Sequence, residues 1–432
     1  MRSDITLMCL EDAVEALIDY RGKTPKKTTS GVPLITAKVI KNGEILEPNE
    51  FIAPENYDSW MVRGLPKVGD VVLTVEAPLG QVAQLTESYV ALAQRVVTLR
   101  GKEGVLDNTY LKYLLMTSKM QAALDGRSSG STVKGIKQSE LRKVELELPD
   151  IGTQRKVASI LASLDNKIAN NKAMNQTLEK LAQRIFKSWF IDFDPVKANK
   201  EGLPFDGLSP EIQALFPSEF EDSELGMIPK GWAAEELSSL ININPRRTIK
   251  KGTVTHHIDM KALPTSSMSI DEVGSKEFKS GTKFINHDTL LARITPCLEN
   301  GKTAYVNCIP GNDIAWGSTE FIVMNPKDEY LREYTYLLAR SDELRAYAIK
   351  NMTGTSGRQR VSGTLVGEFK VSKPNQAVLK AFHKVTASLF MKIATNTENS
   401  VALEKIRDRL LPKLISGQIS VGEAAQELAE AV

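Results

Sequence analysis

Two short loops rich in Gly, Ser, Thr and basic residues carry the clearest chemistry in this sequence. The first runs from Gly126 to Lys134 (GRSSGSTVK) and the second from Thr353 to Arg360 (TGTSGRQR). Small residues leave backbone N–H groups accessible, and the adjacent Arg and Lys side chains add positive charge, so such loops can approach a phosphate backbone closely. A solvated turn is the alternative for either loop alone, but their matching places before a long helical segment favour binding.

Thirteen residues in four basic segments are therefore expected to contact nucleic acid. In the two loops they are Arg127, Ser131, Thr132, Lys134, Arg358, Gln359 and Arg360. Two further clusters, Lys23 to Lys27 and Arg246 to Lys251, contribute Lys26, Lys27, Arg246, Arg247, Lys250 and Lys251. Basic runs are often only solvated faces, and the net charge of +2 means that any nucleic-acid surface is a local patch.

The sequence lacks the common catalytic and nucleotide-binding motifs. It contains no G-x-x-x-x-G-K-[ST] loop, no dinucleotide-binding glycine fingerprint, no G-x-S-x-G elbow and no H-E-x-x-H pair. The tetrapeptide of DNA amino-methyltransferases is also missing, because Arg246 follows Asn244-Pro245. We therefore predict no catalytic residues and interpret the chain as a binding protein.

No metal site is expected either. His256, His257 and Asp259 are close in sequence, but adjacent histidines on a strand point to opposite faces. The three cysteines are scattered without C-x-x-C spacing, which excludes a zinc cluster or a disulfide framework.

A long amphipathic helix is predicted from Thr153 to about Phe190. Apolar residues recur three and four positions apart, as in a coiled-coil seam. They are Val157, Leu161, Leu164, Ile168, Leu178, Ile185 and Trp189. The same stretch recurs later in the chain: Pro149 to Arg184 and Pro374 to Arg409 share twelve identities at a constant offset of 225.

The duplication extends beyond the helices. Asp70 to Pro78 reappears as Asp288 to Pro296, and the first half reads as short β-rich runs with Gly/Pro turns and a helix over Tyr110 to Leu124. We expect an α+β protein with two mixed α/β globules, two long helices and a pseudo-two-fold internal repeat. The predicted segments are a globule at 1–148, a helix at 149–191, a connector at 192–231, a globule at 232–373, and a helix with a tail at 374–432.

The region between the halves has its own character. Five prolines and several acidic residues over 192–231 predict an extended, irregular connector. The segment before it contains Phe186, Trp189, Phe190 and Phe193, which is more apolar surface than a two-helix seam can bury. Either the neighbouring globule or a partner protein covers these aromatic residues, and we hold them as candidate partner-docking residues.

Composition places the chain among ordinary globular proteins. Its 432 residues are 42% hydrophobic and 25% charged, and the acidic N-terminus MRSDITLMCLEDAVEALIDY does not resemble a signal peptide. No apolar run approaches the ~18 residues of a membrane span. We expect a cytoplasmic protein without membrane contact.

Taken together, the two globules, the repeated helices and the closing motifs IFKSWFIDFDPV and LLPKLISGQI resemble the specificity subunit of type I restriction-modification enzymes. The likeness covers essentially the whole chain. It implies that the globules are target recognition domains and that the helices pair antiparallel and dock methyltransferase subunits. It further implies a non-catalytic subunit reading a bipartite double-stranded DNA site, with two methyltransferase and two restriction/motor subunits as partners. No cofactor is expected on this chain; S-adenosylmethionine, ATP and Mg would belong to the partners. The alternative is a duplicated coiled-coil scaffold that does not bind DNA.

An antiparallel pairing also predicts a polar layer at mid-helix. The seam pattern places Asn171 and Asn175 between apolar positions, and the offset of 225 places Asn396 and Ser400 at the same points of the second helix. Midpoints face each other in an antiparallel pair, so these residues would meet and fix the register. The helices would then act as a ruler between the two half-sites.

Overall fold

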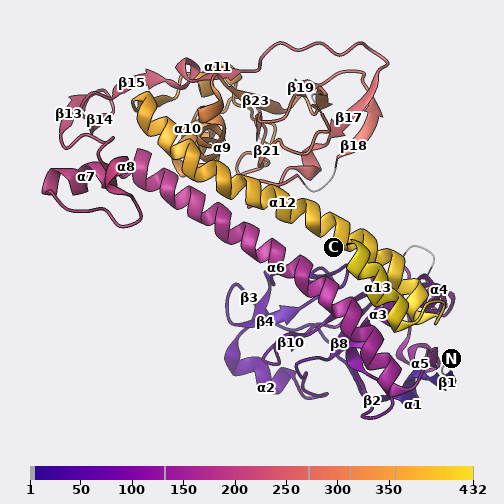
Figure 1. The fold of residues 1–432 in the computed structure, drawn as a ribbon. Coiled ribbons are helices and arrows are strands. Elements are labelled where there is room, and N and C mark those ends of the chain that lie inside the picture. The colour runs from indigo at the N-terminus through magenta and orange to yellow at the C-terminus, as the bar shows by residue number, and fades with distance from the viewer. Residues whose placement is uncertain (1–4, 131–132, 271–272, 312, 356, 432) are drawn as a thin grey trace. The chain divides into compact units, whose positions relative to one another are not determined.

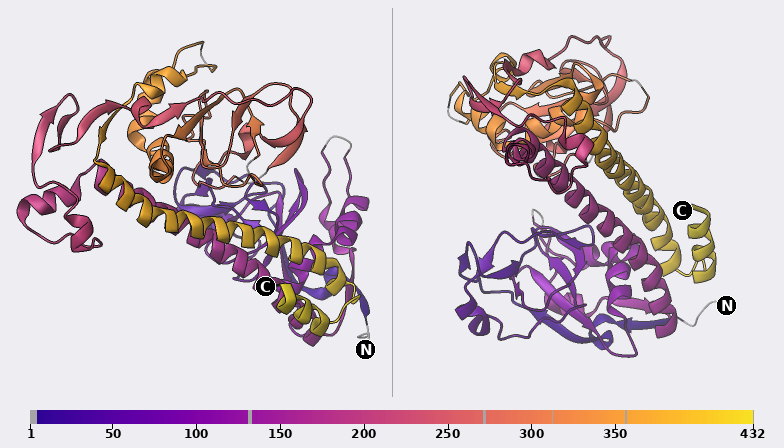
Figure 2. Two further views of the ribbon diagram at one scale, coloured as in Figure 1. Left: turned by 45° about the horizontal axis from the view of Figure 1, so that its top comes forward. Right: turned by 60° about the vertical axis from the view of Figure 1, so that its left-hand side comes forward.

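The computed structural model describes residues 5–130, 133–270, 273–311, 313–355 and 357–431 (Figure 1). The chain forms two compact units. Unit 1 comprises Met1–Ala169 and Val401–Val432, and unit 2 comprises Asn170–Ser400. Two long helices, α6 (Ile151–Phe190) and α12 (Gln376–Ile415), each contribute to both units. Within each unit the α6 segment lies beside the α12 segment (Figure 2).

Both long helices have 40 residues, and their bounds differ by the predicted offset of 225 (376 − 151 and 415 − 190). They also begin alike. The Asp150 carboxylate accepts the Thr153 backbone N–H at 3.0 Å, and the Asn375 side-chain oxygen accepts that of Val378 at 2.9 Å. Such capping satisfies N–H groups that lack a partner inside the helix, so each helix starts where the repeat places its cap.

The first globule spans 6–148 and is built on two larger sheets. One has the antiparallel order β2-β11-β8-β9 and the other the order β10-β4-β7-β3. Their strands are β2 (Val14–Asp19), β11 (Val96–Gly101), β8 (Val71–Val75), β9 (Leu79–Gln84), β10 (Ala91–Leu92), β4 (Val32–Ile35), β7 (Phe51–Ile52) and β3 (Lys27–Thr28). Two short ladders complete it: β1 (Thr6–Cys9) with β12 (Glu145–Leu148), and β5 (Ile40–Lys41) with β6 (Glu44–Ile45).

The second globule spans 233–373 and repeats this plan. Its sheets have the orders β16-β23-β20-β21 and β18-β17-β22-β19. The strands are β16 (Ile241–Ile243), β23 (Phe321–Pro326), β20 (Thr289–Ala292), β21 (Thr303–Tyr305), β18 (Gly274–Glu277), β17 (Val254–Ile258), β22 (Ala315–Gly317) and β19 (Thr282–Phe284). The ladder of β15 (Ala233–Glu236) and β24 (Lys370–Lys373) matches β1 and β12. Each globule also contains one parallel strand pair, β10 with β4 and β22 with β17.

The small helices correspond as well. In the first globule they are α3 (Asn108–Met116), α4 (Ser118–Gly126) and α5 (Gln138–Arg142), and in the second α9 (Arg332–Arg340), α10 (Asp342–Lys350) and α11 (Gly363–Gly367). The segment from Tyr110 to Leu124, expected to be helical from its spacing, forms two consecutive helices, α3 and α4. Thr117 has an extended backbone, and its hydroxyl caps α4 by accepting the Met120 N–H, which divides the segment.

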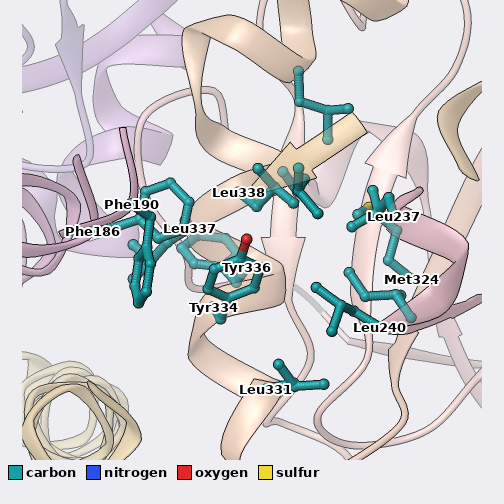
Figure 3. Packing of buried hydrophobic residues seen from close by; sticks show 14 of the residues in the cluster. Phe186, Phe190, Leu237, Leu240, Met324, Leu331, Tyr334, Tyr336, Leu337 and Leu338 are labelled. Carbon is teal, nitrogen blue, oxygen red and sulfur yellow. The ribbon is translucent and has the colours of Figure 1, made fainter. Parts of the chain in front are cut away.

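Buried apolar residues join each globule to the helices of its own unit. In unit 1, Val157, Leu161 and Ile168 of α6 share a core with Leu403 and Leu410 of α12. In unit 2, Phe186 and Phe190 of α6 pack against the α9 residues Tyr334 and Leu337 (Figure 3). Each globule has a further core formed by residues of both its larger sheets. The helices are therefore part of both hydrophobic cores.

The connector is more ordered than the sequence suggests. It contains α7 (Asp194–Glu201), α8 (Pro210–Gln213) and a hairpin of β13 (Phe220–Ser223) with β14 (Gly226–Pro229). Val196, Phe216 and Ile228 are buried in the unit 2 core. Burial of these apolar residues explains why the segment folds instead of remaining extended. Across the described ranges, no helix combines the length and apolar character needed to cross a membrane.

Candidate nucleic-acid interface

The first basic loop is held at its base by backbone hydrogen bonds. Ser129 and Gly135 exchange N–H to carbonyl bonds of 2.9 and 3.0 Å, and the Ile136 N–H donates to the Val75 carbonyl at 3.0 Å. The base of the loop therefore lies beside the end of β8. Ser131 and Thr132, which we expect to contact nucleic acid, lie outside the described residues.

The second loop is anchored in the same way. Thr353 and Arg360 exchange backbone bonds of 2.9 and 2.8 Å, and the Val361 N–H donates to the Arg293 carbonyl at 3.0 Å, just after β20. In both globules a cis X-Pro peptide lies shortly after the residue whose carbonyl anchors the loop: Pro78 after Val75, and Pro296 after Arg293. The equivalence of the two loops, inferred from the sequence, is thus a feature of the fold.

A third segment completes each site. The third residue after β10, Arg95, accepts the Val75 N–H at 3.0 Å, and the third residue after β22, Glu320, accepts the Arg293 N–H at 3.0 Å. Arg95 and Glu320 therefore occupy equivalent positions. The sequence analysis missed both, although the offset of 225 that relates the long helices also relates these two positions (320 − 95).

Two side chains of the first loop form surface ion pairs. Lys134 lies 2.6 Å from the Asp125 carboxylate, and Arg127 lies 3.5 Å from that of Glu140. Pairs this exposed are worth about 1 kcal/mol or less, so a phosphate can displace the carboxylate at little cost. Both residues stay in the set expected to contact nucleic acid.

In the second loop, Arg360 is fixed and Arg358 is exposed. The Arg360 Nε donates to both oxygens of Glu320 at 2.9 Å, and Nη1 donates to the Arg358 carbonyl at 3.0 Å. The hydrogen bond that Arg360 donates to Glu320 raises the pKa of Arg360. Gln359 contributes its carbonyl, which accepts the Thr295 N–H at 3.0 Å.

The basic clusters at the start of the globules are mostly exposed. Lys26, Arg246, Lys250 and Lys251 lie on the surface. Lys27 pairs with Glu50 at 2.8 Å, and its hydrogen bond lowers the pKa of that carboxyl. Lys27 also lines a pocket of about 290 Å³ in the first globule, together with Lys38, Gln94 and Arg95.

Arg247 differs from its neighbours and corrects the sequence-based set. Its guanidinium binds both oxygens of Asp288 at 2.6 and 3.0 Å and donates to the Lys283 carbonyl. The Asp288 side chain is 0% exposed and that of Arg247 11%. Because a fully buried carboxylate requires a partner, Arg247 serves the core of the globule and is not available to nucleic acid.

The four predicted seam residues come together in unit 2. The Asn171 amide donates to the Asn396 carbonyl and the Ser400 hydroxyl at 3.4 and 3.3 Å, and the Asn396 amide donates to the Asn175 oxygen at 2.9 Å. Thr397, which the sequence analysis missed, accepts from Asn175 at 3.1 Å. Asn171 of α6 contacts Ser400 of α12, whereas Asn175, further along α6, contacts Asn396, which is earlier in α12. The two helices therefore run antiparallel.

The aromatic residues considered for partner docking are covered by the chain itself. Phe186, Trp189 and Phe190 are at most 4% exposed, and Phe193 packs against Trp232 with ring centroids 5.8 Å apart. The first of the two alternatives therefore accounts for them, because the unit 2 core already uses their apolar surface. These aromatic residues therefore offer little exposed surface to a partner protein.

The described residues contain no group of three or more His, Cys, Asp or Glu side chains placed to hold a metal ion. His257 is instead packed edge-on against Trp316, with ring centroids 4.2 Å apart, and burial lowers its pKa. His256 faces Asp313 at 3.5 Å.

Comparison with known proteins identifies the family. Residues 3–180 match the family described as type I restriction modification DNA specificity domain. The specificity subunit of the type I restriction enzyme MjaIX from Methanocaldococcus jannaschii is 30% identical over 417 residues, covering 91% of this chain and 88% of the relative. This chain belongs to the type I restriction enzyme specificity subunits. It is a non-catalytic subunit of such an enzyme.

Further matches agree with this assignment. The HindI specificity subunit of Haemophilus influenzae is 26% identical over 349 residues, covering 68% of this chain and 72% of that subunit. The crystal structure of a type I S subunit from M. genitalium superimposes with a TM-score of 0.56 at 16% identity and covers 96% of each chain. That likeness extends to the α+β fold with its two globules and paired long helices.

Proposed function

We propose that this specificity subunit reads a bipartite double-stranded DNA site, with one globule for each half-site. The observation that carries the proposal is the repeated site: in each globule a basic loop is anchored beside the same strand end and next to the same parallel strand pair. Two equivalent sites with different side chains suit two half-sites of different sequence.

Chemistry on the DNA belongs to other subunits in this proposal. Two methyltransferase subunits would bring S-adenosylmethionine, and two restriction subunits would use ATP and Mg. Exposed apolar residues on the long helices supply a docking face. Met174 and Leu181 of α6, seven residues apart, are 44% and 45% exposed. A heptad spacing places both on one side of the helix.

Sequencing native DNA from cells that express the chain with its methyltransferase partner tests the proposal. We expect methylated adenines in two short sequences separated by an unread spacer. Replacing residues 1–148 with the equivalent domain of a relative should change one half-site only. A methylome without a bipartite site, together with duplex binding that ignores salt and sequence, would favour the scaffold alternative.

A further inference from the structure

Each globule holds an arginine–glutamate pair at the point where three segments meet. These are the end of β8 or β20, the segment that follows β10 or β22, and the base of the basic loop. In the first globule, Arg95 Nε lies 3.9 Å from a Glu76 oxygen. In the second, Arg360 Nε lies 2.9 Å from both oxygens of Glu320, and Nη2 lies 2.8 Å from one of them. The pairs occupy corresponding places in the two globules.

The two globules build this pair from different elements. Backbone bonding makes Arg95 equivalent to Glu320 and makes Gly135 equivalent to Arg360. The cation thus follows the parallel strand pair in the first globule and belongs to the basic loop in the second. The shared position carries Arg95 in one half and Glu320 in the other, and each finds its partner on a different segment, so the pair is not a simple relic of the duplication.

Pairing with a carboxylate limits which N–H groups of these arginines remain available to bind DNA. In the second globule Glu320 engages the Nε side of the guanidinium, and Nη1 donates one hydrogen to the Arg358 carbonyl. These bonds leave one N–H on each terminal nitrogen available, and the Arg360 side chain is 39% exposed. Two such donors can bind a phosphate in bidentate fashion and also match the two acceptors of a guanine edge, so the effect on sequence discrimination decides between these ligands.

We propose that Arg95 and Arg360 each read a guanine, one in each half-site, and that Glu76 and Glu320 are positioning residues for them. This inference rests on the proposed function. The first globule adds a pocket of about 290 Å³ in which Arg95 lies beside Gln94, whose side-chain oxygen accepts the Thr24 hydroxyl at 3.3 Å. A concave site of this kind admits a base edge.

Arg95 is tested with the chain in complex with its methyltransferase partner. After the half-sites are known, affinities are measured for the cognate duplex and for duplexes with each base pair substituted. Arg95→Ala should lower cognate affinity roughly 5- to 150-fold, the range for one bidentate arginine–guanine contact, and remove discrimination at one G·C pair of the first half-site. Arg95→Lys should keep the salt dependence without restoring that discrimination.

Matched variants separate the outcomes. Lys119→Ala removes an exposed cation of α4 paired with Glu147 and should leave the substitution profile unchanged. If Arg95→Ala instead weakens all duplexes equally and lowers the salt slope by about one, the residue contacts a phosphate and the inference is wrong. Absence of sequence discrimination in the unaltered complex would overturn the proposed function itself, which is a different result.

The positioning role of Glu320 has its own test. Glu320→Gln keeps the shape but removes the charge that orients Arg360, so it should lose discrimination, by about tenfold or more, at the same G·C pair as Arg360→Ala. Glu235→Gln, which alters a surface pair with Lys373, is the control for folding and binding. Effects of the two variants at different base pairs, or no effect of Glu320→Gln with an unchanged melting curve, would contradict the assignment.

Discussion

At the scale of single residues, sequence neighbours can have opposite roles. Arg246 is exposed, whereas Arg247 pairs with Asp288, a carboxylate whose pKa burial raises although Arg247 acts in the opposite direction. The same buried aspartate occurs in the first globule as Asp70, where Arg100 binds it at 2.7 and 2.8 Å. Composition could mark the basic cluster but not which arginine faces inward, because that choice depends on a partner 41 positions away.

Arg247→Ala should therefore destabilise the second globule. Removing one member of a buried ion pair leaves an uncompensated charge and typically costs about 3–5 kcal/mol of unfolding free energy. Arg246→Ala should leave that free energy unchanged and reduce the salt slope of DNA binding by about one. Urea denaturation and salt-dependent duplex binding measure the two effects. Equal stability of the two variants would refute the structural role of Arg247.

Glu179 is a second buried carboxylate, and hydrogen bonds to neutral groups oppose the effect of burial on its pKa. It accepts the Met268 N–H at 2.8 Å and the Tyr336 hydroxyl at 2.5 Å, but burial dominates and raises its pKa above 4.5. A raised folded-state pKa means that the contribution of Glu179 to stability is greatest at low pH and is lost as the pH rises through that pKa.

We accordingly expect Glu179→Gln to remain within about 1 kcal/mol of the unaltered protein at pH 8, because no charge is buried, the amide oxygen can accept the Met268 N–H and the amide NH2 can donate to the Tyr336 hydroxyl. Its unfolding free energy should also lose this component of pH dependence above pH 4.5. Glu179→Leu, which leaves both donors unpaired, should be destabilised by about 2 kcal/mol or more. Urea titrations at several pH values measure both, and equal losses for Gln and Leu would show that the charge itself is needed.

At the scale of elements, the long helices were predictable and their attachments were not. The sequence placed the start of α6 within two residues of Ile151. The seam pattern also predicted that four polar residues meet between the helices: Asn171, Asn175, Asn396 and Ser400. Periodicity along a helix is a local signal. The globule attachments depend on residues distant in sequence, such as the Asp165 carboxylate, which accepts from Lys112 at 2.8 Å, Tyr113 at 2.7 Å and Arg407 at 2.9 Å.

Asp165→Asn should weaken unit 1. Burial raises the pKa of Asp165, but Lys112 and the hydrogen bonds outweigh this and lower it below 3.8. Its contribution is therefore present at neutral pH and lost as the pH falls through the folded-state pKa. We expect a loss of roughly 3 kcal/mol at pH 7 that shrinks below about pH 4, measured by urea denaturation. Asp125→Asn, at an exposed pair, is the control and should cost less than about 1 kcal/mol.

The exposed side of α6 carries the docking prediction. Met174→Glu with Leu181→Glu should reduce co-purification of the methyltransferase subunit at least about tenfold, because two charges replace apolar contact area. Both side chains are exposed, so the melting temperature of the chain alone should not change. Gln176→Glu adds charge at a neighbouring exposed position and serves as the control. Unchanged co-purification of the double variant would place the docking face elsewhere.

At the scale of the whole molecule, duplication explains why so much could be predicted. Each half repeats the order of sheets, small helices and a long capped helix, so weak patterns in one half were supported by the other. What could not be predicted lies where the halves differ. Arg95 occupies the position that Glu320 has in the other half. Arg247, which lies between β16 and β17, has the role that Arg100 of β11 has in the first globule, because different side chains satisfy the same structural need in each half.

The final prediction concerns the length of the spacer between half-sites. Asn171 is the twenty-first of the 40 residues of α6, and Asn396 is the twenty-first of α12, so the polar layer lies at both midpoints. A buried polar layer penalises slipped pairings, since a shifted asparagine would face apolar seam residues without hydrogen-bond partners. The helices can therefore set a defined length.

Inserting one heptad immediately before Asn171 and another immediately after Ser400 adds seven residues to both helices at the same level and keeps the seam in phase. At 1.5 Å per residue the pair lengthens by roughly 10 Å, which corresponds to about two to three base pairs of duplex. Methylome sequencing should show both half-sites unchanged and a spacer longer by that amount. A heptad in α6 alone leaves the seam unmatched and should abolish modification. If the doubly extended protein modifies DNA fully with the original spacer, the helices do not set the distance.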